Sequence, residues 1–180
     1  YKNPCNVDVF FALSHGVHRG VLKSGKTDDR ITFLNKLVST TPDIKFDIYG
    51  IKKVQPIWAD HYFKTIQNAK MGLNLSRGDA IKYYSSDRIT QIIGNGLVCL
   101  IDEKTQYNNF FNSNEMVFYK NVSDLSEKII KISKDEKLRK KIAKNGKKKY
   151  MKYFNSDLVA QYIINKTLDI KVKTRNYWEK

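Results

Sequence analysis

Three polar segments of this 180-residue chain carry side chains that can bind an anion, and the first two of them directly follow short apolar runs. The first segment, residues 14–26, places Arg19 and Lys23 among three glycines. Glycine lets the backbone approach a ligand closely, and the two cations can balance a negative charge. The pattern fits a diphosphate, and a solvated loop explains it equally well.

The other two segments add a guanidinium, hydroxyls and the start of a helix. Residues 74–78 read Asn-Leu-Ser-Arg-Gly, which puts Ser76 and Arg77 at the end of an apolar run. Farther along, Ser86 precedes Asp87 and Arg88 at a predicted helix start, where free N–H groups and the helix dipole favour an anion. An ordinary helix cap would explain Ser86 alone. Three such segments together favour an anion site.

A parallel sheet would bring these segments to one edge. The apolar runs are continuous rather than alternating, and helical patterns separate them, which is typical of strands buried on both faces. We expect an α/β fold with a doubly wound, mostly parallel, Rossmann-like sheet flanked by helices and a helical C-terminus. The expected strands are 8–13, 44–50, 71–75, 97–101 and 116–119. The expected helices are 28–41, 60–69, 87–93, 123–133, 135–154 and one from 155 onward.

The motif around Arg88 resembles a known family. Residues 88–96, Arg-Ile-Thr-Gln-Ile-Ile-Gly-Asn-Gly, precede an apolar strand and resemble the donor-site segment of GT-B glycosyltransferases, in group 1 and its CgeB-like relatives. Residues 74–78 and the strand and two helices up to Gly146 resemble the same family. The likeness extends over about residues 8–168. It implies the C-terminal, nucleotide-sugar-binding half of such an enzyme, with residues 1–170 as one domain and 171–180 as a tail.

The resemblance implies a function and a set of site residues. The expected function is metal-independent transfer of a sugar from a nucleotide diphosphate donor to a glycan, lipid or protein acceptor, with the acceptor held mostly by a missing N-terminal domain. The expected donor-binding residues are Arg19, Lys23, Ser76, Arg77, Ser86, Arg88, Gln91, Asn95 and Gly96. No cofactor is expected besides the donor.

One departure from the family limits what the resemblance carries over. Many relatives have a glutamate at the position of Gln91 that holds the donor ribose, and the partner glutamate of the retaining enzymes would fall at Tyr83. A retaining mechanism is therefore not carried over, although Gln91 can still hydrogen-bond a hydroxyl. A sugar-nucleotide-binding relative without catalysis stays open, and no catalytic residue is assigned.

The net charge of +15 offers a rival interpretation. Residues before Ser123 hold 16 basic and 11 acidic side chains, so +10 of the excess lies from Ser123 onward, centred on the lysine-rich segment 137–152. This segment could bind nucleic acid, yet lysine lacks the planar fork that reads phosphates and bases in fixed geometry. We expect a solvated helix face or a contact with anionic lipid. The expected location is the cytoplasm, with the inner face of the membrane as an alternative.

Two histidines and two aromatic residues are further candidates for binding a ligand. His15 and His18 lie three residues apart, but no third ligand is near them in the sequence, so no metal site is predicted. Tyr49 and Trp58 lie near the end of the second expected strand, where an aromatic ring could stack on a nucleobase. Packing in the core is the more common role of such residues, and it is the role expected of Tyr62.

Overall fold

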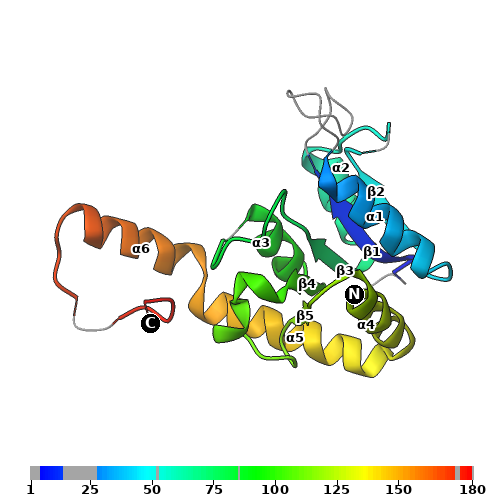
Figure 1. Cartoon of the computed structure of the whole chain (residues 1–180). Helices are drawn as coiled ribbons and strands as arrows, with labels where there is room; N and C mark the ends of the chain where they lie inside the picture. Colours follow the sequence, from blue (N-terminus) through cyan, green and yellow to red (C-terminus); the bar gives the residue numbers. More distant parts are fainter. Residues whose placement is uncertain (1–4, 14–27, 52, 85, 173–174, 180) are drawn as a thin grey trace.

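The computed structural model describes residues 5–13, 28–51, 53–84, 86–172 and 175–179 (Figure 1). Strands and helices alternate along the first part of this chain, and helices follow. The strands are β1 (Val7–Ala12), β2 (Phe46–Tyr49), β3 (Ala69–Asn74), β4 (Val98–Asp102) and β5 (Val117–Tyr119). The α-helices are α1 (Asp29–Thr40), α2 (Ala59–Ile66), α3 (Asp87–Gly94), α4 (Val122–Lys134), α5 (Glu136–Tyr153) and α6 (Ser156–Thr167). Two short 3-10 helices, η1 (Glu103–Thr105) and η2 (Tyr107–Asn109), follow β4.

All strand pairs are parallel, in the order β2-β1-β3-β4-β5. From β1 the chain first moves outward to β2, then returns to the other side of β1 and continues through β3 to β5. The order therefore reverses between β1 and β3. In open parallel sheets a crevice forms at such a reversal, outside the carboxyl ends of the strands, and ligands bind there. The predicted doubly wound fold is confirmed.

Helices cover both faces of the sheet, which explains the continuous apolar runs. Val9 and Phe11 of β1 pack with Leu34 of α1 and with residues of α4, whereas Phe10 packs with Ile66 of α2 on the other face. Helices α3 and α5 complete that second face. Each strand residue therefore meets apolar side chains whichever way it points.

Side-chain caps fix where several helices begin. Asp28 accepts a hydrogen bond from the backbone N–H of Arg30 at α1, and Asp135 accepts one from Leu138 at α5. Asn121 caps α4 two residues before the predicted start at Ser123. Helix α2 has no side-chain cap, and β3 already begins at Ala69, which the sequence pattern had placed in the preceding helix.

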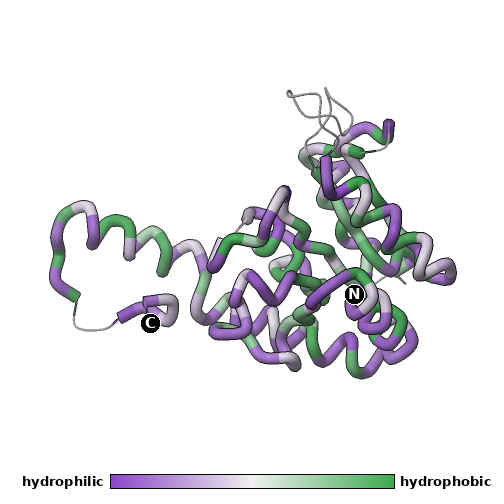
Figure 2. The backbone as a smooth tube through the Cα atoms, viewed as in Figure 1, coloured by the Kyte–Doolittle hydropathy of each residue, from purple (hydrophilic) through white to green (hydrophobic). Residues whose placement is uncertain are grey.

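The C-terminal part of the chain differs from the expected free tail. Helix α6 extends away from the sheet and has no buried residue, and apolar residues lie along it (Figures 1 and 2). Residues 175–179 nevertheless pack back on the molecule. The ring centroids of Tyr177 and Tyr153 lie 4.5 Å apart, and those of Trp178 and Phe154 lie 5.7 Å apart. Aromatic side chains thus hold residues 175–179 of the predicted tail against the end of α5. In the described part of the chain, no helix has the length and apolar character that crossing a bilayer requires.

Tyr119, at the end of β5, offers a stability test. It is 1% exposed, burial raises its pKa, and its hydroxyl has no hydrogen-bond partner among the described residues. Because a buried hydroxyl without a partner is destabilising, Tyr119→Phe should raise the free energy of unfolding in urea by about 1 kcal/mol. Tyr150→Phe is the matched control, since the Tyr150 hydroxyl lies 2.8 Å from Thr90 Oγ1 and its removal should lower stability. Equal effects of the two substitutions would contradict this expectation.

Candidate functional site

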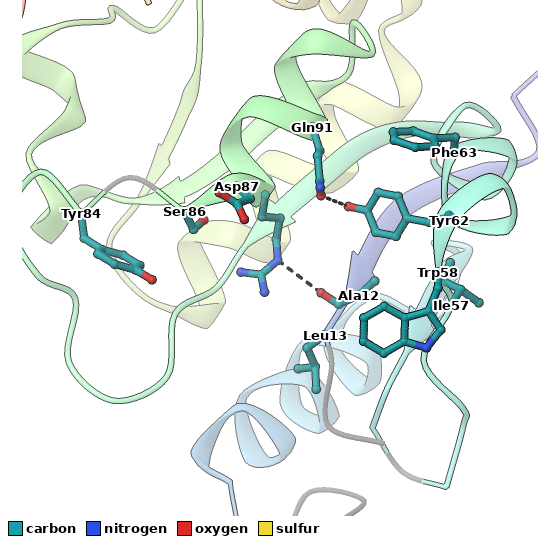
Figure 3. Close-up of a pocket in the computed structure, with 12 residues that line it drawn as sticks. Ala12, Leu13, Ile57, Trp58, Tyr62, Phe63, Tyr84, Ser86, Asp87 and Gln91 are labelled. Atoms are coloured by element: carbon teal, nitrogen blue, oxygen red, sulfur yellow. Dashed lines mark hydrogen bonds between the residues drawn. The ribbon is translucent and has the colours of Figure 1, made fainter. Parts of the chain in front are cut away.

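A pocket of about 550 Å³ opens at the carboxyl ends of the strands (Figure 3). Its walls come from the end of β1, the start of α2 and the start of α3. It therefore lies in the crevice where the strand order reverses, beside the N-terminus of a helix. The lining residues are Ala12, Leu13, Ile57, Trp58, Ala59, Tyr62, Phe63, Tyr84, Ser86, Asp87, Arg88 and Gln91.

Arg88 holds the two strands of this crevice together. Its Nε donates to the carbonyl oxygen of Ala12 at 3.3 Å, and one terminal nitrogen donates to the carbonyl oxygen of Leu75 at 3.1 Å. The guanidinium also lies over the Phe11 ring, 5.0 Å from its centroid. These contacts fix the side chain and leave further N–H donors of the guanidinium for a ligand in the pocket.

The charge on Arg88 has no carboxylate partner among the described residues. Burial lowers its pKa, and the positive charge of Arg30 lowers it further. Arg30 itself is paired, because its Nε lies 2.9 Å from Asp28 Oδ1 and a terminal nitrogen lies 2.6 Å from Asp28 Oδ2. Arginine nevertheless stays protonated at neutral pH. The pocket therefore contains a half-buried positive charge that an anionic ligand would stabilise.

The start of α3 supplies polar groups beside Arg88. Ser86 occupies the N-cap position, but its hydroxyl lies 2.8 Å from Asn74 Oδ1 and caps no helical N–H. One turn into the helix, Gln91 Oε1 accepts a hydrogen bond from the Tyr62 hydroxyl at 2.5 Å (Figure 3). Burial raises the pKa of Tyr62, so this hydroxyl stays protonated and donates. The side-chain amide nitrogen of Gln91 can still donate a hydrogen bond to a hydroxyl oxygen of a ligand.

The structure brings together three of the predicted site residues, Ser86, Arg88 and Gln91, which line the same pocket. Ser76 and exposed Arg77 lie near the end of β3 but not in the pocket lining. Beside Arg77, the backbone N–H of Gly78 donates to Asp29 at 3.0 Å, which ties this loop to the start of α1. Arg19 and Lys23 lie outside the described residues, as do His15 and His18.

The structure does not bring Asn95 and Gly96 to this pocket. Asn95 is the C-cap residue of α3, and its side-chain amide donates to the carbonyl oxygen of Gln91 at 2.8 Å. Helix α3 runs antiparallel to the strands, so its last residues lie at the amino ends of the strands, near Asn68 and Ala69. Asn95 and Gly96 lie outside the lining of the Arg88 pocket, and their contact with a donor stays a prediction.

Aromatic side chains form part of the pocket wall. Trp58 is 63% exposed and Tyr84 is 49% exposed, and they lie on opposite sides of the pocket (Figure 3). Tyr62, expected to pack in the core, also lines the pocket, as does Phe63. Tyr49 packs instead against Phe10, with ring centroids 6.2 Å apart. The helical position of Tyr62, four residues after Trp58, was the available signal, because both then lie on one face of α2.

Within the described part of the chain, no group of three or more His, Cys, Asp or Glu side chains is placed to hold a metal ion. Asp102, which could have faced a ligand, accepts a hydrogen bond from the backbone N–H of Lys104 and so caps η1.

Comparison with known proteins bears on this site. Residues 30–165 match the protein family described as glycosyl transferase-like. The chain belongs to that family. No sequence of a curated protein matches this member of the glycosyl transferase-like family.

Solved structures share its fold. The glycosyl transferase-like chain superposes on TarM with a TM-score of 0.66 at 10% identity, covering 92% of this chain and 36% of TarM. Sucrose-phosphate synthase from Thermosynechococcus elongatus gives a TM-score of 0.62 at 11% identity, covering 93% of this chain and 46% of that enzyme. The C-terminal domain of LpcC, a group 1 glycosyl transferase from Francisella tularensis, gives a TM-score of 0.50 at 14% identity. This match covers 71% of this chain and 64% of the LpcC domain. The predicted resemblance to C-terminal domains of GT-B glycosyltransferases is confirmed, and the chain spans about a third of the length of TarM.

Proposed function

We propose that this domain binds the nucleotide diphosphate sugar of a glycosyltransferase in the pocket around Arg88. The observation that carries the proposal is the half-buried guanidinium of Arg88, which has no carboxylate partner among the described residues and lies where the strand order reverses. A diphosphate supplies the missing negative charge. Family membership supports the proposal, as does a structure of a S. aureus TarM mutant with UDP, fondaparinux and alpha-GlcNAc-glycerol, which has the same fold (TM-score 0.63, 12% identity, 92% and 36% coverage).

The pocket residues fit distinct parts of such a donor. Arg88 and the N-terminus of α3 would hold the diphosphate, which becomes the leaving group when its bond to the anomeric carbon breaks. Gln91 and Asp87 offer hydrogen-bonding groups for ribose or sugar hydroxyls. The exposed ring of Trp58 would stack on the base. We propose that cations, with Arg19, Lys23 and Arg77 as further candidates, balance the charge of the leaving group in place of a metal ion.

The binding site of the acceptor is also part of the proposal. Because the relatives of known structure are longer than this chain, we propose that a preceding domain holds a glycan, lipid or protein acceptor. A sugar-nucleotide-binding domain without transfer activity is the second candidate. The observation that favours it is at Gln91, the position where many GT-B glycosyltransferases have a glutamate. In this chain Gln91 is neutral and accepts a hydrogen bond from the Tyr62 hydroxyl.

Titration of the chain with UDP and purine nucleoside diphosphates tests the proposal. At least one should bind and raise the melting temperature, with and without a metal chelator. Trp58→Ala should weaken that binding by about 5- to 150-fold, since stacking on an aromatic ring contributes about 1–3 kcal/mol. Trp58→Phe keeps a ring and should stay within about threefold of the original chain. Failure of every nucleoside diphosphate to bind would overturn the proposal.

A further inference from the structure

A second hollow, of about 1390 Å³, lies at the amino ends of the strands, on the edge of the sheet opposite the Arg88 pocket. Its walls come from the end of α2, the start of β3, the ends of α3 and α4, and the first half of α5. We call it the basic groove. Seven basic side chains line it: Lys64, Lys70, Lys134, Arg139, Lys140, Lys144 and Lys147.

The basic groove is more than the solvated face of one lysine-rich helix. Four of its cations come from α5, but Lys64 comes from α2, Lys70 from β3 and Lys134 from α4. Exposed Lys137 and Lys141 of the same helix α5 lie outside its lining. The fold therefore collects cations from segments far apart in the sequence around one hollow.

Few carboxylates balance these charges. Glu136 is the one acidic side chain among the described lining residues, and it pairs with Lys140 at 2.5 Å. Asp8 pairs with Lys70 at 2.6 Å. The other five cations form no ion pair among the described residues. Arg139 donates to the carbonyl oxygen of Ser133 over 3.4 Å, which is long for a hydrogen bond. Like charges held around one hollow repel each other, and an anion in it would relieve this repulsion.

The remaining lining side chains indicate what kind of anion fits. Among the described residues they are small or polar, include Ala69, Ala143 and two glycines, and contain no aromatic ring. A surface that binds single-stranded nucleic acid normally supplies rings on which bases stack. A surface that inserts into a membrane normally supplies large apolar side chains and a face that lies flat on the lipid. The described lining of the basic groove forms a hollow and supplies neither feature.

We propose that the basic groove binds a linear polyanion, a flexible chain with phosphate or sulfate groups repeated along it, through charge and without base stacking. Lysine suits this role, because its mobile point charge follows a flexible chain without demanding one geometry. The proposal goes beyond donor binding, since groove and pocket lie at opposite edges of the sheet and share no lining residue.

Fluorescently labelled inorganic polyphosphate tests the proposal by anisotropy at several salt concentrations. The groove variant is Lys134→Gln, Arg139→Gln and Lys144→Gln combined. The matched control, Lys137→Gln, Lys141→Gln and Lys148→Gln combined, removes the same net charge from exposed positions of α5. The groove variant should bind at least about tenfold more weakly and lose about one unit of salt slope per removed cation, whereas the control should change affinity less than about threefold.

Three results would overturn the proposal. Equal losses in the two triple variants would show diffuse attraction to net charge. Binding to phosphatidylglycerol vesicles without binding to polyphosphate would assign the surface to lipid. Binding to single-stranded DNA without binding to polyphosphate would assign it to nucleic acid. Both triple variants should unfold at the same urea concentration, which shows that neither loses its fold. Arg88→Gln should leave polyphosphate binding unchanged, so a failure of polyanion binding can be told apart from a failure of donor binding.

Discussion

Replacing Arg88 with glutamine should weaken binding of a nucleoside diphosphate to this domain by about 100-fold. The guanidinium is fixed by the carbonyl oxygens of Ala12 and Leu75 and by the Phe11 ring, so its position in the pocket is set before a ligand arrives. A charge-assisted hydrogen bond to an anion contributes about 1.5–3 kcal/mol, and about 1.4 kcal/mol corresponds to a tenfold change in affinity. Isothermal titration calorimetry with the diphosphate that binds the original chain measures the loss.

Two companion variants separate charge from geometry and from folding. Arg139→Gln removes the same charge at the opposite edge of the sheet and should leave nucleotide affinity within about twofold. Arg88→Lys keeps the charge but not the planar fork, so its affinity should lie between those of Arg88→Gln and the original chain. Unchanged affinity in Arg88→Gln, with an unfolding curve that shows a folded domain, would remove Arg88 from the site.

Gly146→Ala should destabilise the fold by about 3 kcal/mol. Gly146 lies in the middle of α5, where the helix passes against the segment before β5, and a Cβ atom there would lie 2.3 Å from the backbone carbonyl oxygen of Glu115. A backbone atom cannot rotate away, so α5 or the segment must shift, and such overpacking costs about 1–3 kcal/mol or more. Urea unfolding followed by circular dichroism measures the change.

Gly94→Ala is the matched control for this substitution. Gly94 is the last residue of α3, and the nearest heavy atom to an added Cβ there is the terminal methyl of Met151 at 4.0 Å. Alanine in an open helical position should stabilise by up to about 1 kcal/mol, because glycine loses more backbone entropy on folding. A Gly146→Ala protein as stable as the original would contradict the close approach of α5 to Glu115.

The sheet could be predicted from the sequence because its strands are apolar on both faces. Val9, Phe10 and Phe11 follow one another, and only a strand covered on two sides buries all three. Arg88 could be predicted for a related reason: a helix that follows a parallel strand starts at the carboxyl edge of the sheet. The ion pair of Asp28 and Arg30 was missed, because two residues so near in sequence gave only the signal of a helix cap.

Asn95 and Gly96 belong to the same sequence motif as Arg88 but lie outside the lining of its pocket. They lie seven and eight residues after Arg88, and a helix rises about 1.5 Å per residue, so a straight helix places them about 10–12 Å farther along. The motif contains both ends of α3, and only one end meets the pocket. The basic groove was beyond sequence reasoning for another reason, since Lys64, Lys70 and Lys134 become neighbours only when the sheet assembles.

Helix α3 has a consequence for how binding energies combine in this protein. Its first turn borders the Arg88 pocket, and its last residues border the basic groove. Sites about one short helix apart that share no side chain usually contribute to free energy independently. The affinities of the Arg88 pocket and the basic groove should then be independent of each other. A ligand long enough to occupy both would bind more tightly, because attachment at one site raises its effective concentration at the other.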